Sequence, residues 1–163
     1  MTGGADARVH EFVTANAEET IRAGRAIAKL LVPPRFLILR GDLGAGKTTL
    51  VKGIAEELEA ADADEVTSPT FTLIHEYEGM RSGEPVRLYH LDLYRIENER
   101  QLDTLGLDDL SGPDSIVLVE WGEKFPTVVS RSNGEIEMTS TGGDTRKVKL
   151  TLRDQGSRET GNS

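Results

Sequence analysis

Two short, uninterrupted apolar runs stand out in the hydrophobic and polar pattern of this 163-residue chain. They are residues 36–39 (FLIL) and 116–119 (IVLV). Runs of this length that do not alternate with polar positions are typical of strands buried on both faces of a parallel sheet. We therefore expect both segments in the centre of one sheet, with helices packed on its two sides.

Helices are expected before and after the first of these runs. Apolar residues of the earlier helix recur at helical spacing, at Ile21, Gly24, Ile27, Ala28 and Leu31. Asn16 with Glu19 three positions later is a capping-box pattern that predicts its start, and the prolines at 33 and 34 predict its end. The later helix is expected over residues 47–58, directly after a glycine-rich segment.

The remaining pattern predicts two β-hairpins and a weak helix. Residues 66–77 and 86–94 are rich in β-branched and aromatic side chains, and the stretch between them, 78–85, is rich in turn residues. Apolar and polar residues alternate over 135–152 around a central turn, which predicts a second antiparallel hairpin. Residues 97–110 are weakly helical.

The order of these elements predicts one α/β domain over residues 10–152, with antiparallel hairpins added to a mainly parallel central sheet. The chain length also fits a single domain. The two polar ends have no apolar pattern, so we expect a flexible N-terminus over 1–9 and a disordered tail over 153–163.

Charge and cysteine content narrow the function classes. Lys and Arg number 19 against 28 Asp and Glu, giving a formal net charge of −9. A field of this sign disfavours binding of nucleic acid or an anionic membrane over the whole surface, although a local basic patch can still exist. No apolar run approaches the roughly 18 to 20 residues of a membrane helix, and no secretory signal pattern is present. Cysteine is absent, which excludes disulfides and thiol chemistry. We expect a cytoplasmic protein.

The segment that carries chemistry is GDLGAGKT (41–48), which fits the phosphate-binding pattern G-x4-G-K-[ST]. It follows an apolar strand and opens a helix, so the strand, loop and helix predict a three-layer P-loop NTPase-like fold. Its glycines let the backbone approach phosphate oxygens, and successive N–H groups at a helix N-terminus attract anions. Lys47 is expected to contact the β- and γ-phosphates, and the Thr48 hydroxyl to bind Mg²⁺. The nucleotide-binding residues expected here are Asp42, Leu43, Gly44, Ala45, Gly46, Lys47, Thr48 and Thr49.

Two carboxylates are candidates for binding the metal or orienting a water molecule. Glu120 directly follows the second apolar run, in the position of a Walker B acid. Asp92 lies in YHLDLYR (89–95), where strand alternation places His90, Asp92 and Tyr94 on one face. That face is either part of a site or a hydrated sheet surface. The sequence leaves open which carboxylate touches Mg²⁺ directly.

Three further positions are candidates for the nucleotide site. Thr70 lies in TSPTF (67–71), whose hydroxyls either sense a γ-phosphate or simply begin a strand. Arg95 can meet a phosphate or pair with a carboxylate. Trp121, the single tryptophan, either stacks near the nucleotide or anchors the core.

Four motifs together resemble the bacterial TsaE family in both order and spacing. They are GDLGAGKTT (41–49), TSPTF (67–71), YHLDLYR (89–95) and VEW (119–121). The first motif is shared by many families, whereas the combination with the other three is much more specific. The resemblance covers about residues 10–152.

The resemblance implies a small Mg²⁺-dependent ATPase that is required for the N6-threonylcarbamoyladenosine (t6A) modification of tRNA beside the anticodon, acting with the proteins TsaD and TsaB. By resemblance, Lys47 and Thr48 bind the phosphates and Mg²⁺. The resemblance also places Thr70 and Asp92 in the nucleotide and metal site and makes Glu120 the Walker B-like acid. Lys47, Asp92 and Glu120 are therefore the expected catalytic residues. The net charge of −9 suggests that tRNA is reached mostly through the partner proteins.

Other classes of nucleotide-binding protein stay open from the residues alone. A kinase would need an arginine-rich lid, and the arginines here are dispersed. A GTPase is disfavoured because the chain has no NKxD-type guanine motif. A nucleotide-gated adaptor would need ATP binding without hydrolysis. We expect slow turnover of the isolated ATPase, because no arginine is placed as an arginine finger near the loop.

Overall fold

The structure is a computed structural model that describes residues 7–41, 46–62, 65–67, 69 and 73–153. Its strands are β1 (Arg8–Thr14), β2 (Arg35–Gly41), β3 (Ile74–Arg81), β4 (Glu84–Asp92), β5 (Ser115–Glu120), β6 (Gly134–Gly142) and β7 (Thr145–Leu152). Its α-helices are α1 (Ala17–Leu30), α2 (Lys47–Glu57), α3 (Glu99–Asp103) and α4 (Pro126–Arg131), and two short 3-10 helices are η3 (Leu107–Leu110) and η4 (Gly122–Lys124).

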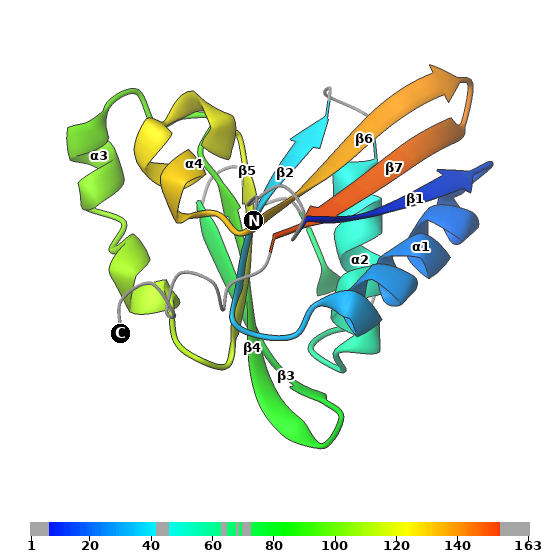
Figure 1. Ribbon diagram of the computed structural model, residues 1–163, viewed down its shortest axis with the longest axis horizontal. Coiled ribbons are helices and arrows are strands. Elements are labelled where there is room, and N and C mark those ends of the chain that lie inside the picture. The colour runs from blue at the N-terminus through cyan, green and yellow to red at the C-terminus, as the bar shows by residue number, and fades with distance from the viewer. Residues whose placement is uncertain (1–6, 42–45, 63–64, 68, 70–72, 154–163) are drawn as a thin grey trace.

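The strands form one seven-stranded sheet in the order β1-β7-β6-β2-β5-β4-β3 (Figure 1). The four central strands, β6, β2, β5 and β4, are mutually parallel. At one side β3 pairs antiparallel with β4. At the other side β7 pairs antiparallel with β6, and β1 pairs antiparallel with β7. The two apolar runs are β2 and β5, which lie next to each other and are almost wholly buried. The predicted α/β class, with a parallel centre and antiparallel additions, is confirmed.

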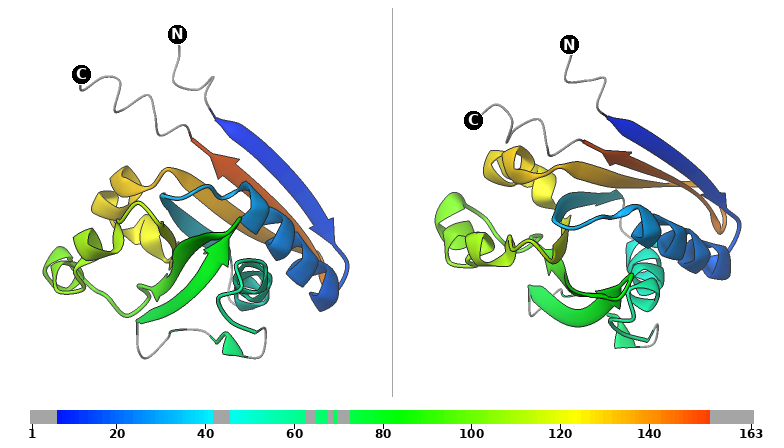
Figure 2. Two further views of the ribbon diagram at one scale, coloured as in Figure 1. Left: turned by 90° about the horizontal axis from the view of Figure 1, so that it is seen from below. Right: turned by 60° about the horizontal axis from the view of Figure 1, so that its bottom comes forward.

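Helices lie on both faces of the sheet and enclose two separate cores (Figures 1 and 2). Helices α1 and α2 pack side by side on one face, over a core that includes Ile27, Leu50 and Leu118. Helices α3, η3 and α4 cover the other face, over a core that includes Leu102 and Val119. Adjacent residues of β5 therefore face opposite cores, which is why this strand reads as an unbroken apolar run.

Two glycines bring α1 and α2 into backbone contact. A Cβ added to Gly24 would lie 2.3 Å from the carbonyl oxygen of Leu50, and one added to Gly53 would lie 2.0 Å from that of Ile21. Real side chains cannot occupy such positions, so the helix pair depends on glycine at both sites. Because α2 begins at Lys47, this packing also fixes where the end of the glycine-rich segment lies.

The start of α1 agrees with the predicted N-cap at Asn16, whereas Glu19 bonds the residue before the N-cap and not the N-cap itself. Asn16 Oδ1 accepts a hydrogen bond from the Glu19 backbone N–H at 2.9 Å, and Glu19 Oε1 accepts one from the Ala15 N–H at 2.7 Å. Helix α2 begins at the expected residue, and the C-terminal hairpin is formed by β6 and β7 as expected. The weakly helical segment is two short helices, α3 and η3, separated by Gly106 in the left-handed conformation.

The turn predicted within 78–85 is present but shorter than that stretch, because β3 and β4 continue through most of it. The turn consists of Ser82 and Gly83 alone, which have φ values of 53° and 82°. Two consecutive positive φ angles are typical of tight turns that match the twist of paired strands, so the strands extend further toward the turn than predicted. At its other end the first strand is shorter than predicted, because β3 begins at Ile74 and not at residue 66.

Three elements were not predicted, β1, η4 and α4. Strand β1 pairs along its whole length with β7, and it includes Arg8 and Val9, which fall in the segment expected to be flexible. Helix α4 begins with Pro126 in its first turn, a position that tolerates proline. Residues 1–6 and 154–163, where the flexible start and the polar tail were predicted, lie outside the described residues.

Candidate functional site

The residues that the sequence singles out meet at the carboxyl ends of β2, β5 and β4. Glu120 is the last residue of β5, and the parallel register places it opposite Leu39 of β2 on one side and Asp92 of β4 on the other. Helix α2 begins beside this edge, after the segment that follows β2. Ligands of open α/β sheets bind at this end of the strands, so the topology alone makes it the candidate site.

Lys47 is directed into this edge from the first position of α2. Its Nζ donates to the Gly41 carbonyl oxygen at 2.9 Å and lies 3.4 Å from Glu120 Oε1. The residue is only 7% exposed, which is uncommon for a lysine. The helix N-cap, Gly46, has a φ of 97°, a conformation that favours glycine. The structure thus brings the lysine of the glycine-rich segment against the predicted Walker B acid.

Among the described residues, each oxygen of the Glu120 carboxylate has one partner. Oε1 faces Lys47, and Oε2 lies 2.6 Å from Nε2 of His90, a side chain with no exposed surface. Burial by itself raises the pKa of Glu120, but the hydrogen bond and charge of His90 and the charge of Lys47 outweigh it and hold the pKa below its ordinary value. Glu120 is therefore an ionised, buried carboxylate that accepts hydrogen bonds.

Asp92 is the second buried carboxylate at this edge, and it is 6% exposed. Its Oδ1 accepts a hydrogen bond from the Tyr94 backbone N–H at 2.9 Å, which orients the side chain at the end of β4. Asp92 and Glu120 face each other in register on neighbouring parallel strands, so their side chains lie on the same face of the sheet. The alternation that places His90 and Asp92 together is confirmed, and the face they occupy is buried.

Tyr94 does not continue this face, because β4 ends at Asp92 and the Tyr94 side chain is 61% exposed. Its ring instead contacts the Trp121 ring, with the centroids 5.2 Å apart. Nζ of Lys124 donates to the carbonyl oxygens of Leu93, Tyr94 and Ile96, at 2.9 to 3.2 Å, and so fixes the turn that carries Tyr94. No sequence signal distinguished Lys124 from an ordinary surface lysine.

Trp121 lies between the core and the candidate site. Its φ of 64° is in the left-handed region, an unfavourable conformation for a bulky residue, of the kind that gathers at functional sites. Nζ of Lys47 is 5.4 Å from the centroid of the Trp121 ring. The indole is half-buried and lies close to both the lysine and the Tyr94 ring.

The other predicted residues fall into three groups. Thr48 and Thr49 are half-buried in the first turn of α2, next to Lys47. Arg95 is exposed in the segment after β4, unlike the buried residues of the edge. The remaining predicted residues lie outside the described residues, and they are Asp42, Leu43, Gly44, Ala45 and Thr70.

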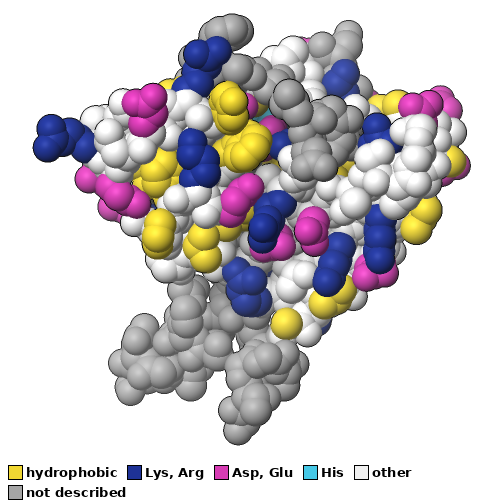
Figure 3. All heavy atoms as spheres, turned by 90° about the horizontal axis from the view of Figure 1, so that it is seen from above, with side chains coloured by type: hydrophobic (Ala, Val, Ile, Leu, Met, Phe, Trp, Pro, Cys, Tyr) yellow, Lys and Arg dark blue, Asp and Glu magenta, His cyan; other side chains and the backbone are white. Residues whose placement is uncertain are grey.

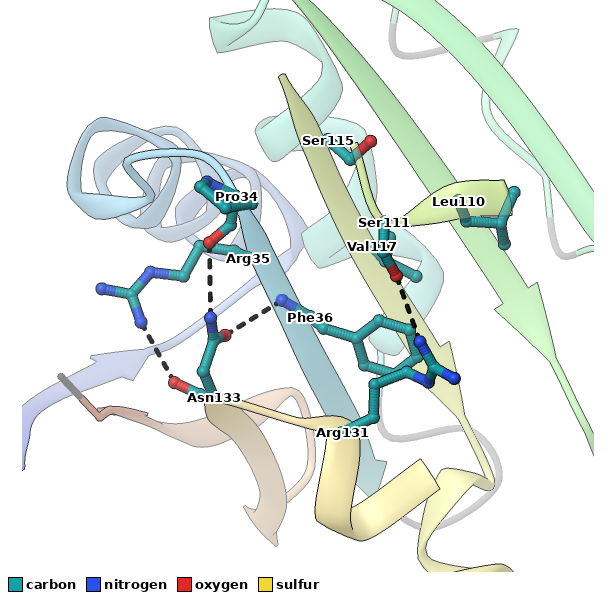
Figure 4. Close-up of a pocket in the computed structure, with 9 residues that line it drawn as sticks. All are labelled: Pro34, Arg35, Phe36, Leu110, Ser111, Ser115, Val117, Arg131 and Asn133. Atoms are coloured by element: carbon teal, nitrogen blue, oxygen red, sulfur yellow. Dashed lines mark hydrogen bonds between the residues drawn. The ribbon is translucent and has the colours of Figure 1, made fainter. Parts of the chain in front are cut away.

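A cavity of about 240 Å³ lies at the opposite, amino-terminal end of the parallel strands (Figure 4). Its lining includes the first residues of β2 and β5 and contains none of the predicted site residues. Arg35 donates there to the carbonyl oxygens of Asn133 and Arg153, at 3.0 Å each, and the Arg131 guanidinium lies over the Phe36 ring at 5.9 Å. The hydrogen bonds of Arg35 join β2 to the residue before β6 and to the residue after β7, and the Arg131 contact joins β2 to α4.

The face that contains the carboxyl end of β2 is shown from above in Figure 3. Basic and acidic side chains are interspersed over its described part and do not form one continuous basic field. Within the described ranges, no helix is long and apolar enough to cross a membrane.

Fold and site together define a mixed α/β protein in which the end of β2, the lysine that begins α2 and two buried carboxylates lie at one edge of the sheet. The family model described as "Threonylcarbamoyl adenosine biosynthesis protein TsaE" matches residues 14–148. The chain belongs to the TsaE family, whose members are involved in t6A biosynthesis on tRNA.

Individual relatives agree with this assignment. The chain is 39% identical over 139 residues to the tRNA threonylcarbamoyladenosine biosynthesis protein TsaE of Bacillus subtilis, covering 85% of this chain and 82% of the relative. It is 36% identical over 138 residues to the protein of the same name from Treponema pallidum, covering 85% and 97% of the two chains. Among solved structures, the crystal structure of Bacillus subtilis YdiB superposes with a TM-score of 0.65 and 30% identity, covering 96% of this chain and 93% of that one.

Proposed function

We propose that this protein is a Mg²⁺-dependent P-loop ATPase that supports t6A modification of tRNA together with TsaB and TsaD. The observation that carries the proposal is the buried contact between Lys47 and Glu120, at 3.4 Å, at the carboxyl edge of the parallel sheet. This contact brings the lysine of a phosphate-binding pattern next to a carboxylate that is suited to bind Mg²⁺ or to orient the attacking water.

Lys47 would supply positive charge to the phosphates of ATP. In this structure its ammonium group has a carbonyl oxygen and a carboxylate oxygen as partners, at 2.9 and 3.4 Å. Triphosphate oxygens carry more charge than either partner, so they would compete for the same ammonium group. The N-terminus of α2 lies at the same place and adds its partial positive charge, which favours an anion there.

The donor set at the edge fits Mg²⁺. Mg²⁺ prefers oxygen ligands, and it commonly takes one or two protein carboxylates together with phosphate oxygens and water. Asp92, Glu120 and the Thr48 hydroxyl provide such oxygens. In the described ranges, no three or more His, Asp or Glu side chains are grouped so that they could hold a metal ion by themselves. The bound ion would neutralise charge that develops on the phosphates.

The two carboxylates would then have different roles. Both oxygens of Glu120 already have partners, whereas the one contact described for Asp92 is the hydrogen bond to its Oδ1. Asp92 is therefore the better candidate for a direct metal ligand. Glu120, held ionised, is suited to accept a hydrogen bond from water and orient it toward the γ-phosphorus. Attack by that water breaks the bond between the γ-phosphorus and the bridging oxygen, giving ADP and phosphate.

The link to tRNA would run through partner proteins in the cytoplasm. The net charge of −9 and the interspersed charges of Figure 3 are unfavourable for holding a polyanion over a broad surface. Driving or resetting a partner complex with ATP needs only a local site for the phosphates. Lys47 and the N-terminus of α2 would provide that site.

The test is phosphate release from ATP by the purified full chain, with and without Mg²⁺. We expect release that requires Mg²⁺ and that is lost in Lys47→Ala. ADP and phosphate should form in equal amounts without a phosphorylated acceptor, which distinguishes an ATPase from a kinase. Mg²⁺-dependent ATP binding without any release, even when TsaB and TsaD are added, would favour the nucleotide-gated adaptor.

A further inference from the structure

His90 is buried next to the candidate site but has no part in the function proposed above. Its side chain has no exposed surface, and Nε2 lies 2.6 Å from Glu120 Oε2. Nδ1, on the other side of the ring, has no hydrogen-bond partner among the described residues. The hydrogen bond to Glu120 compensates the buried imidazole for its removal from water. Breaking that bond would therefore be costly for His90.

The direction of this hydrogen bond follows from chemistry. An ionised carboxylate has lone pairs but no proton, so it can only accept. The proton between the two groups therefore belongs to Nε2 of His90, which donates to Oε2 of Glu120. The geometry leaves Oε1, the other oxygen of the same carboxylate, for Lys47.

Nucleotide binding would change the surroundings of Glu120 on one side only. If Lys47 turns its ammonium group toward phosphate, Oε1 of Glu120 loses that partner. A buried carboxylate that loses all its partners is strongly destabilised and tends to turn away or take up a proton. His90 is on the far side of the carboxylate, on β4, and its hydrogen bond does not depend on Lys47.

We infer that His90 is a positioning residue whose Nε2–H holds Oε2 of Glu120, so that Oε1 keeps facing the nucleotide after Lys47 has turned to the phosphates. This inference rests on the proposed ATPase function. In that function Lys47 binds the substrate and Glu120 orients the water. His90 acts only through Glu120. The alternative is that the His90 contact serves folding alone.

Two amide substitutions separate these roles. The side-chain amide nitrogen of Gln can occupy about the position of Nε2 in His, whereas that of the shorter Asn falls about where Nδ1 is. His90→Gln therefore keeps a donor for Glu120, and His90→Asn removes it while leaving a polar, uncharged side chain. Asn also leaves a small void in the sheet face, so the unfolding temperature of both variants must be measured alongside activity.

The experiment measures kcat and KM for phosphate release, affinity for a non-hydrolysable ATP analogue with Mg²⁺, and unfolding temperature. For His90→Asn we expect kcat to fall by about 10-fold or more, with KM and analogue affinity within about 3-fold of wild type, as for a group that acts on orientation. His90→Gln should recover most of kcat. The inference is overturned if the two variants have equal kcat, or if analogue affinity falls as much as kcat in His90→Asn.

A second readout does not depend on hydrolysis. Nitrogen-15 NMR of labelled histidine should show the His90 Nε2–H as a slowly exchanging proton, and adding the ATP analogue with Mg²⁺ should leave it in place. Loss of that proton signal on analogue binding overturns the inference even if hydrolysis is normal. Absence of phosphate release by wild-type protein alone and with its partners, with the Nε2–H retained, contradicts the proposed ATPase instead.

Discussion

The Nζ atom of Lys47 lies 3.4 Å from Oε1 of Glu120, and both side chains are buried at the carboxyl edge of the sheet. One comes from the first turn of α2 and the other from the end of β5, so the contact depends on the whole parallel centre being formed. A buried lysine and a buried carboxylate are each costly alone. Their pairing, together with His90, lets this edge hold both charges next to the position expected for phosphate.

Lys47→Ala should abolish phosphate release and weaken nucleotide binding. The substitution removes the cation that is proposed to face the phosphates, and losses of one such group reduce kcat by about 100-fold or more. Lys52→Ala is the matched control, because Lys52 lies on the same helix and the predicted phosphate contacts do not include it. Calorimetric titration with an ATP analogue and a phosphate-release assay measure the two effects. Equal activity of the two variants would contradict the role of Lys47.

Acid should remove a part of the stability that Glu120 provides. The pKa of Glu120 is lower in the folded chain than its ordinary value of 4.5, so its stabilisation is complete above about pH 4.5 and is lost as the pH falls through the folded value. Urea unfolding of nucleotide-free protein in a chelator should show a difference between wild type and Glu120→Gln that is constant near neutral pH and shrinks below about pH 4.5. A difference that grows on acidification would contradict the assigned pKa direction.

Gly24→Ala and Gly53→Ala should each destabilise the fold by about 2 kcal/mol or more, because the new Cβ would force α1 and α2 apart. Lys29→Ala, at an exposed position of α1, is the control and should change the free energy of unfolding by less than about 0.5 kcal/mol. Chemical denaturation measures all three. Neutral glycine substitutions would mean that the two helices do not touch through their backbones.

The fluorescence of Trp121 should report nucleotide binding. Trp121 is the single tryptophan of the chain, and its ring centroid is 5.4 Å from Nζ of Lys47. A nucleotide that draws Lys47 toward its phosphates changes the charge beside the indole, so emission should shift on addition of ATP with Mg²⁺. Tyr94→Phe keeps the neighbouring ring and should leave the response intact. Unchanged emission at a saturating concentration established by calorimetry would contradict this placement of Lys47.

The sequence predicted the elements whose signals are local. Unbroken apolar runs marked β2 and β5 because both faces of each strand are buried, and the capping pattern at Asn16 marked the start of α1. It did not predict β1, because this edge strand alternates only weakly and is defined by pairing with β7, far along the chain. The turn at Ser82 and Gly83 was expected to be longer because polar and glycine residues around it suggested a wider loop.

The candidate site was predictable to a similar degree. The positions of Lys47 and Glu120 followed from motif and strand ends, and their contact agrees with that reading. The role of His90 could not be predicted, because its partner lies on another strand and the alternation of β4 fits a hydrated face equally well. The one available signal was that His90 and Asp92 share a face near the end of β4.

The most direct test of the central claim is reconstitution of tRNA modification. Unmodified tRNA, a threonylcarbamoyl donor, TsaB and TsaD are combined with ATP and Mg²⁺, and t6A is measured by mass spectrometry with no addition, with the wild-type chain or with Lys47→Ala. We predict repeated rounds of t6A formation only in the reaction that contains the wild-type chain. Equal t6A formation in all three reactions would contradict the claim that ATP hydrolysis at the Lys47–Glu120 edge supports this modification.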